Sequence, residues 1–439
     1  MDAAAAPAPK LLGLYEQPWL RKSRPAQPAR SVALPTAPYL THLALLPGAP
    51  AVLVAASSDG ALRAHDPASL APLASSTWHG GSISALAASP QGALAAGMDG
   101  TVALWDPRVG SAPALQLKGP ADAPYLSVAI AQNGTSVAAG TELKGYEAMI
   151  DLWDLRSAAK PAYIYTESHS DDVTSLSFHP SSHAHLLLSG STDGLLSVLD
   201  TRVSDEDDAV LGVANTGASV ASAGWGGSSA QQSTSAGAEM QIDGGDAELD
   251  VKEARAEGMG GFWGVSDMQT VSVWNEQFDA TLPSIDVRTV RCLDWETDYC
   301  IDASDARALA WDGQGADADG FVFWAGSNSG RAALVQTGSG TSESSTPWKV
   351  LTLLPDTSAG GHADVVRTVC WDRPSRTLYT GGEDGLLCAW DMTAAAAGTA
   401  DESSSPLPAG SFAGSFDSSP AAGGASRKAS KQHSRHTPY

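Results

Sequence analysis

Ser191-Thr192-Asp193-Gly194 runs directly into Leu195–Asp200, and Gly382-Glu383-Asp384-Gly385 runs in the same way into Leu386–Asp391. In both stretches a tight turn with Asp-Gly precedes a short apolar run that ends in aspartate. Asp-Gly beside alternating apolar residues is typical of a turn between two strands. Weaker copies of this turn and strand recur along the chain, and the seven strands end at Asp66, Asp106, Asp154, Asp200, Asn275, Gln336 and Asp391.

The spacing of these seven strand ends predicts the architecture. The first four are 40, 48 and 46 residues apart, and the later spacings of 75, 61 and 55 residues indicate insertions. A period of about 40 to 45 residues built from short strands is typical of a β-propeller, in which each four-stranded blade is covered only by its neighbours. We therefore predict an all-β, seven-bladed propeller over residues 11–392.

Three segments are unlike blades. Residues 223–258 are rich in Gly, Ser and acidic residues, and residues 393–439 change from Ala-rich to Ser-rich and then to basic. Such compositions bury too little apolar surface to order themselves. We predict a disordered loop at about 223–258 inside the fifth blade, a disordered N-terminus over residues 1–10 and a disordered, basic-ended tail over 393–439.

The outer edge of the last blade needs a partner strand. The chain after Asp391 lacks a convincing strand, and an open sheet edge favours aggregation. A segment near the start of the chain, residues 11–20 or residues 31–34, is expected to pair there and close the ring.

Three of the seven strands end in a Trp-Asp dipeptide, at Trp105-Asp106, Trp153-Asp154 and Trp390-Asp391. With this feature the units resemble WD40 repeats. The resemblance implies a buried hydrogen-bonded chain that joins a His before the first strand, an Asp in the turn, a Ser or Thr on the second strand and the Trp on the third. Because buried polar groups need partners, we expect these residues to stabilise the blades and not to act in catalysis or metal binding.

The last unit contains all four residue types, whereas the fourth lacks the Trp and the second lacks the hydroxyl. The residues at the four positions are His362, Asp384, Thr380 and Trp390 in the last unit, His169, Asp193, Ser189 and Leu199 in the fourth, and His79, Asp99, Ala95 and Trp105 in the second. Several longer stretches, among them residues 168–174 and 178–181, also resemble one subfamily of these proteins for which no activity is assigned.

The composition limits the classes of function. The formal net charge is -23, which argues against nucleic-acid binding because phosphate contacts require clustered Lys and Arg. Four cysteines without CxxC spacing, and the absence of known catalytic motifs, predict no metal, no cofactor and no enzymatic activity. No apolar run approaches the about 18 residues of a membrane span, so we expect an intracellular protein of the nucleus or cytoplasm.

These features favour a non-catalytic scaffold that binds protein partners through loops on one rim of the propeller. We expect it to be a monomer that works within larger complexes. The candidate binding residues form an acidic group that would select a basic partner, although a solvated loop is an equally simple interpretation. They are Asp171, Asp172, Asp205, Glu206, Asp207 and Asp208.

An alternative function is that of a substrate receptor of a cullin-type ubiquitin ligase. Such receptors carry a Trp-Asp dipeptide followed one residue later by Arg, as at Arg108 and Arg156 in this chain. Arg at this position also occurs in propellers where it only pairs with the Asp at the edge of its own blade. Both interpretations of Arg108 and Arg156 remain open from the sequence.

Overall fold

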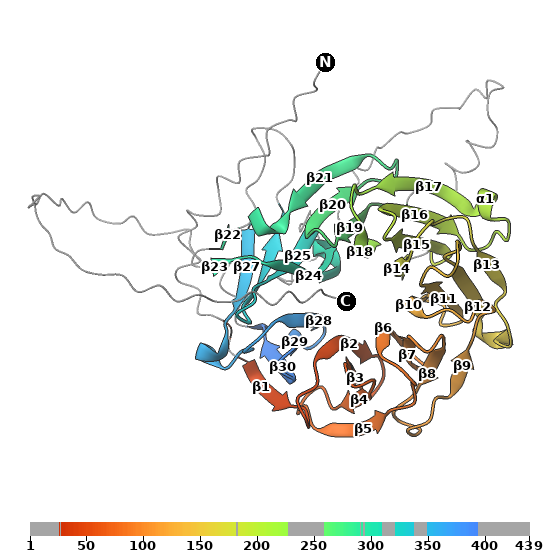
Figure 1. Ribbon diagram of the computed structural model, residues 1–439. Helices are drawn as coiled ribbons and strands as arrows, with labels where there is room; N and C mark the ends of the chain where they lie inside the picture. The colour runs from red at the N-terminus through yellow and green to blue at the C-terminus, as the bar shows by residue number, and fades with distance from the viewer. Residues whose placement is uncertain are drawn as a thin grey trace, which may run out of the picture. The chain divides into compact units, whose positions relative to one another are not determined.

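The computed structural model describes residues 26, 28–180, 183–226, 259–289, 291–292, 295–309, 321–337 and 349–393, all within one compact unit of the chain. These residues form seven four-stranded antiparallel sheets that follow one another as blades around a ring (Figure 1). A two-stranded sheet of β22 (Arg291–Cys292) and β23 (Trp295–Glu296) lies between the fifth and sixth blades in the chain. The predicted all-β, seven-bladed propeller is confirmed.

Each blade is a meander whose first strand is innermost (Figure 1). From the centre outward, the first four blades are β2 (Leu40–Leu46), β3 (Val52–Ser57), β4 (Leu62–His65), β5 (Pro72–Ser76); β6 (Ile83–Ser89), β7 (Gly92–Gly97), β8 (Val102–Trp105), β9 (Leu115–Leu117); β10 (Tyr125–Ile130), β11 (Ser136–Thr141), β12 (Ile150–Asp154), β13 (Tyr163–Tyr165); and β14 (Val173–Phe178), β15 (Leu186–Ser191), β16 (Leu195–Asp200), β17 (Val210–Asn215).

The remaining blades follow the same order, except that the outermost strand of the seventh comes from the start of the chain. They are β18 (Val220–Trp225), β19 (Phe262–Ser266), β20 (Thr270–Trp274), β21 (Ala280–Asp286); β24 (Tyr299–Asp305), β25 (Phe321–Gly326), β26 (Ala332–Gln336), β27 (Lys349–Leu354); and β28 (Val366–Asp372), β29 (Thr377–Gly382), β30 (Leu386–Asp391), β1 (Pro28–Ala33). The short helices are η2 (Leu155–Ser157), α1 (Glu206–Ala209), η3 (Val287–Thr289), α3 (Ala306–Leu309) and η4 (Thr357–Ala359).

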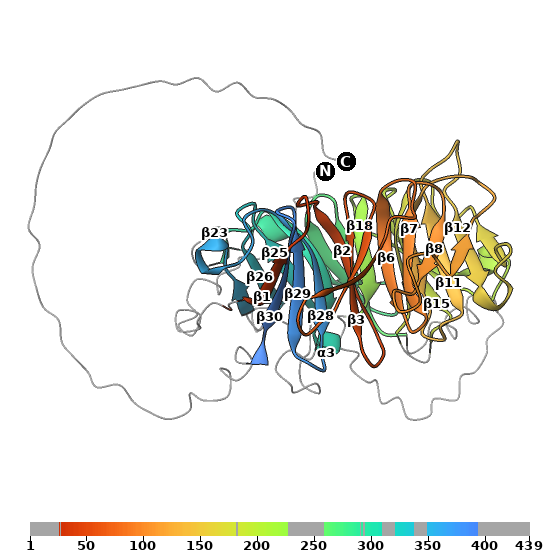
Figure 2. The same cartoon turned by 90° about the horizontal axis from the view of Figure 1, so that it is seen from below.

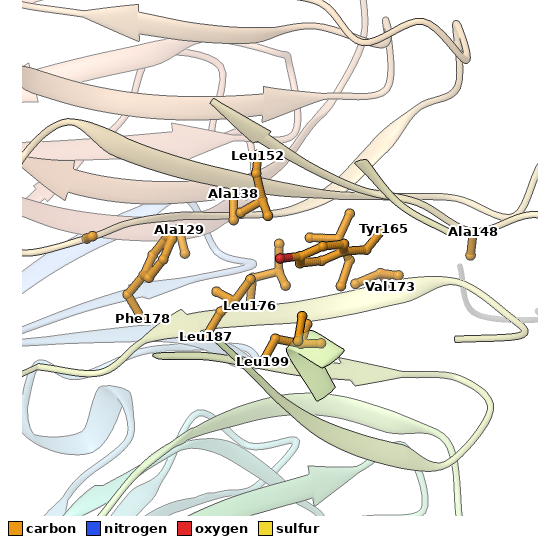
Figure 3. Close-up of a cluster of buried hydrophobic side chains, with 13 residues drawn as sticks. Ala129, Ala138, Ala148, Leu152, Tyr165, Val173, Leu176, Phe178, Leu187 and Leu199 are labelled. Carbon is orange, nitrogen blue, oxygen red and sulfur yellow. The ribbon is translucent and has the colours of Figure 1, made fainter. Parts of the chain in front are cut away.

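The apolar core lies between the blades. Seven clusters of buried side chains each span two neighbouring blades. Between the third and fourth blades, Leu176 and Leu187 of the fourth pack near Tyr165 of the third (Figure 3). Fully burying one Leu side chain contributes about 1.5 to 3 kcal/mol to the stability of the fold. Because these side chains are buried between blades, each blade is stabilised mainly by its neighbours.

Strand β1 closes the ring. It pairs with β30 in antiparallel register from Pro28 opposite Trp390 to Ala33 opposite Leu386, where the red and blue ends of the described chain meet in Figure 1. The predicted closing segment 31–34 is therefore confirmed over Ser31–Ala33. The other candidate, residues 11–20, lies outside the described residues, as do residues 1–10.

The predicted start of the insertion in the fifth blade is wrong. Residues 223–225 belong to β18, where they pair with β19. A Cβ atom at Gly224 would lie 2.4 Å from the ring of Trp263, so this glycine makes room for a large neighbour, while the Trp225 indole donates to the Ser177 carbonyl at 2.9 Å. Residues 223–225 are held in the blade by residues far away in the chain, which their own composition does not reveal. Residues 227–258 lie outside the described residues.

The predicted tail also starts too early, by one residue. Thr393 is described and donates through both its amide and its hydroxyl to Asp391, at 2.9 and 2.6 Å. Residues 394–439 lie outside the described residues.

The loops lie on two rims, and Figure 2 shows the blades edge-on between them. We call one the crossover rim; it carries the connections from blade to blade, such as residues 166–172, and the turns between second and third strands, such as residues 192–194. We call the other the hairpin rim; it carries the connections between first and second and between third and fourth strands.

Candidate functional site

In the seventh blade the four repeat residues form one continuous chain of hydrogen bonds. Nδ1 of His362 lies 3.1 and 3.2 Å from the two carboxylate oxygens of Asp384, and its Nε2 lies 2.8 Å from Oγ1 of Thr380. The Trp390 indole donates to the same hydroxyl at 2.8 Å. Burial alone would raise the pKa of Asp384, but the hydrogen bond from His362 and the bonds from nearby amides outweigh it and lower the pKa.

The fourth blade has the first part of this chain. His169 contacts Asp193 at 3.2 Å and Ser189 at 2.8 Å. Leu199 stands at the Trp position, so Ser189 accepts no bond from an indole, and its hydroxyl donates to the Ser197 carbonyl at 3.3 Å.

The second blade keeps only the His–Asp pair. Nδ1 of His79 lies 3.2 Å from Asp99, but with Ala95 at the hydroxyl position its Nε2 has no hydrogen-bond partner among the described residues. The Trp105 indole donates to the Gly110 carbonyl at 2.7 Å. Each missing residue type therefore removes one link of the chain.

The third blade has a different buried polar pair, which sequence reasoning missed. The indole N–H of Trp153 has no partner in the described part of the chain, whereas the Tyr125 hydroxyl donates to the fully buried carboxylate of Asp151. Burial raises the pKa of Asp151 to about 6, although the bond from Tyr125 acts in the opposite direction. The only signal in the sequence is an Asp between the apolar residues Ile150 and Leu152.

The predicted acidic residues come from two connections that the structure joins through Glu206. The carboxylate of Glu206 accepts hydrogen bonds from the amides of Thr166, Glu167 and Ser168 at 2.6, 2.9 and 2.6 Å. Glu206 begins helix α1, which lies at the outside of the ring near β13 and β17 in Figure 1. The loop after β16 leaves its blade on the hairpin rim, and Glu206 ties its second half to the crossover from the third to the fourth blade.

The other acidic residues differ in exposure. Asp205, Asp207 and Asp208 are exposed, whereas Asp171 and Asp172 are half-buried. Asp172 accepts from the Leu143 amide at 2.7 Å, which ties it to the loop between β11 and β12.

We use the name acidic sector for eight carboxylates that come from this crossover, from the loop between β11 and β12 and from the loop after β16. Its members are Glu142, Glu147, Glu167, Asp171, Asp172, Asp205, Asp207 and Asp208.

Arg108 and Arg156 both contact the Asp two residues earlier. Nε of Arg108 donates to Asp106 at 2.8 Å, and Nε of Arg156 donates to Asp154 at 2.9 Å, as does Arg202 to Asp200 in the next blade. All three follow third strands and so lie on the hairpin rim. The Arg156 side chain is nevertheless 77% exposed, and its hydrogen bond is the main cause that lowers the pKa of Asp154 to about 2.

In the part of the chain that the structure describes, no group of three or more His, Cys, Asp or Glu side chains is arranged to hold a metal ion. No helix in the same residues is long and apolar enough to cross a membrane.

Comparison with known proteins agrees with the blade geometry. Residues 71–106, 160–200 and 354–391 match the family model "WD domain, G-beta repeat". They end with the third strands of the second, fourth and seventh blades, the blades with a His–Asp hydrogen bond described above. The chain thus contains WD40 repeats and folds as a seven-bladed β-propeller, and WD40 propellers generally serve as scaffolds for protein interactions and are typically non-catalytic.

Three curated relatives are WD repeat proteins. An uncharacterised WD repeat-containing protein of Schizosaccharomyces pombe is 37% identical over 134 residues, which cover 29% of this chain and 40% of the relative. WD repeat-containing protein GTS1 of Arabidopsis thaliana is 28% identical over 331 residues, covering 69% of this chain and 67% of that protein. A WD repeat-containing protein 89 homolog of Dictyostelium discoideum is 32% identical over 138 residues, covering 31% of this chain and 35% of the homolog.

WD repeat-containing protein 89 is the subfamily that the longer stretches of this sequence resemble. The matched regions span less than half of the Schizosaccharomyces and Dictyostelium relatives.

Proposed function

We propose that this propeller is a non-catalytic scaffold that binds a basic segment of a partner protein at the acidic sector. The observation that carries the proposal is the contact of Glu206 with the amides of Thr166, Glu167 and Ser168. This contact brings carboxylates from the loop after β16 next to those of the crossover into the fourth blade. Such a concentration of one charge steers an oppositely charged partner and increases its rate of association.

Loops on a rigid all-β frame are a common place for recognition, which supports the same proposal. The sector lies on loops whose backbone is held by side chains, as at Asp172 and Glu206. Little ordering entropy is therefore lost when a partner binds. A monomer in the nucleus or cytoplasm, working within larger complexes, is part of the proposal.

Charge reversal within the sector tests this function. In a triple variant, Asp205, Asp207 and Asp208 are each replaced by Lys, and Glu206 is kept because it holds the loop. Partners isolated with the wild-type protein and identified by mass spectrometry should contain Lys/Arg-rich segments and should be lost with the variant. Binding should also weaken as salt concentration rises, because exposed charges are screened.

The matched control reverses two exposed carboxylates in the fifth blade, Asp267 and Asp279. It changes the net charge in the same direction but leaves the acidic sector intact, so the same partners should remain. An unchanged set of partners with the triple variant would refute binding at the sector.

The ubiquitin-ligase hypothesis stays a prediction. In its support, Arg108, Arg156 and Arg202 occupy the same position in three consecutive blades on the hairpin rim. Against it, each guanidinium already pairs with the Asp of its own blade. Co-purification with the propeller adaptor of the ligase, abolished by replacing Arg108 and Arg156 with Ala, would support a receptor function.

A further inference from the structure

The loop between β11 and β12 is longer than its counterparts. It has eight residues, 142–149, whereas the turns between second and third strands in the other six blades have three to five. Within it, Lys144 and Glu147 form an antiparallel bridge, with the Lys144 amide 3.0 Å from the Glu147 carbonyl. The extra residues therefore form a small hairpin on the crossover rim of the third blade.

Tyr146 occupies the tip of this hairpin. The two tip residues are Gly145, with a φ of +73°, and Tyr146, whose side chain is 99% exposed. A positive φ at the first position of a two-residue hairpin turn is the conformation that glycine provides without strain. The turn thus presents an aromatic ring to solvent without any packing of that ring against the blade.

The hairpin is anchored on both sides. The Lys144 ammonium donates to the carbonyls of Ala121 and Asp122 at 2.9 and 2.7 Å, in the crossover from the second to the third blade. On the other side, the Leu143 amide donates to Asp172 at 2.7 Å. An exposed aromatic residue on a backbone held in this way is suited to a binding anchor, because its position is set before a partner arrives.

The charges around the tip are mainly negative. Glu142 and Glu147 flank it in the hairpin, and Asp172 lies at its base. Of the lysines in this region, Lys144 directs its ammonium to backbone carbonyls, and Lys118 pairs with Asp122 at 2.7 Å. Carboxylates beside an aromatic face favour a cation over the ring, and a planar guanidinium stacks on such a face better than an ammonium.

We propose that Tyr146 is the anchor of the binding surface and that its ring stacks on an arginine side chain of an Arg-rich partner segment, whose other cations contact the acidic sector. This inference rests on the proposed function and specifies the partner further, as Arg-rich in preference to Lys-rich.

The test measures binding of two fluorescein-labelled octapeptides to the full chain by fluorescence anisotropy. One peptide alternates arginine and glycine, and the other alternates lysine and glycine. The wild-type protein should bind the arginine peptide more tightly. Tyr146→Ala should weaken that binding about threefold to thirtyfold and remove most of the preference for arginine, whereas Tyr146→Phe, which keeps the aromatic face, should stay within about twofold of wild type.

Tyr39→Ala is the matched control, because Tyr39 is 51% exposed in the connection that precedes β2 on the same rim. It should leave both affinities unchanged. Equal losses for Tyr39→Ala and Tyr146→Ala would overturn the inference, as would failure of the wild type to bind either peptide.

A further outcome separates this inference from the proposed function. If the Lys triple variant at Asp205, Asp207 and Asp208 loses the peptides but Tyr146→Ala does not, the acidic sector binds basic segments without the tyrosine. That result would overturn the anchor and leave the scaffold function standing.

Discussion

The Thr380 hydroxyl joins two buried groups in the seventh blade, Nε2 of His362 and the indole of Trp390. A buried polar group that loses its partner costs about 1 to 3 kcal/mol. Replacing Thr380 with Val keeps the branched shape but removes the hydroxyl and leaves both groups unpaired, so it should lower the free energy of unfolding by about 2 to 4 kcal/mol. Urea unfolding followed by tryptophan fluorescence measures the change.

Ser189→Ala in the fourth blade is the comparison. It removes the hydroxyl partner of His169 and the longer bond to the Ser197 carbonyl, but it leaves no indole unpaired, because Leu199 stands where the seventh blade has Trp390. The expected loss is about half of that for Thr380→Val. Equal losses would contradict the idea that the hydroxyl serves two partners in the seventh blade.

Asp151 should make the stability of the fold depend on pH. Burial raises its pKa to about 6 in the folded protein, against 3.8 for an ordinary Asp. The folded state therefore keeps its proton over a range in which the unfolded state has lost it, so the free energy of unfolding falls as pH rises from about 4 to about 6. Over this range the free energy of unfolding should fall by a total on the order of 3 kcal/mol.

Asp151→Asn cannot ionise and should remove this part of the pH dependence, as measured by urea unfolding at several pH values. Tyr125→Phe removes a bond that lowers the pKa of Asp151, so it should move the fall in stability to higher pH. Asp302, whose pKa burial also raises to about 6, contributes separately, and Asp302→Asn is the matched variant. If the free energy of unfolding of Asp151→Asn depended on pH in the same way as that of the wild type, the predicted ionisation of Asp151 would be contradicted.

At the level of elements, the first strands share a feature that the repeat pattern does not reveal. In all seven blades the register between the first and second strands shifts within the first four residues of the first strand. In three successive blades a hydroxyl near this shift donates to the first strand of the following blade: Ser84 to the Tyr125 carbonyl, Ser127 to that of Val173 and Thr174 to that of Val220. These bonds join neighbouring blades around the centre of the ring.

Individual strands could be predicted where the local sequence pattern was strong. They could not be predicted where a residue far away in the chain determines the local conformation. The turn and third strand of the seventh blade follow from Glu383-Asp384-Gly385 and the apolar run after it. The end of β18, residues 223–225, was assigned to the insertion, because Gly224 fits only against the ring of Trp263 in the next strand. The hairpin tip at Tyr146 was missed for a similar reason, since its anchors at Ala121 and Asp172 lie in other loops.

For the whole molecule, closure by β1 is the step that completes the ring. Deleting residues 28–33 leaves the outer edge of β30 without its partner strand. Stability should fall by about 1 kcal/mol for each backbone hydrogen bond lost, and the open edge should promote aggregation. Thermal unfolding and light scattering measure both effects.

Deletion of residues 1–10, which were predicted to be disordered from their composition, is the control for that truncation. It should leave the unfolding midpoint and the light scattering unchanged. A 28–33 deletion that unfolds and scatters like this control would show that the ring does not depend on β1.

The repeat period, the Asp-Gly turns and the Trp-Asp strand ends already establish the number of blades, because these signals involve residues close together in the chain. The same short-range signals locate the His–Asp pairs of the second, fourth and seventh blades. Contacts between distant residues decide the rest. Glu206 holds an amide segment about 40 residues earlier, and β1 pairs with a strand at the far end of the propeller, so the binding surface and the closed ring exist only once the blades have packed together.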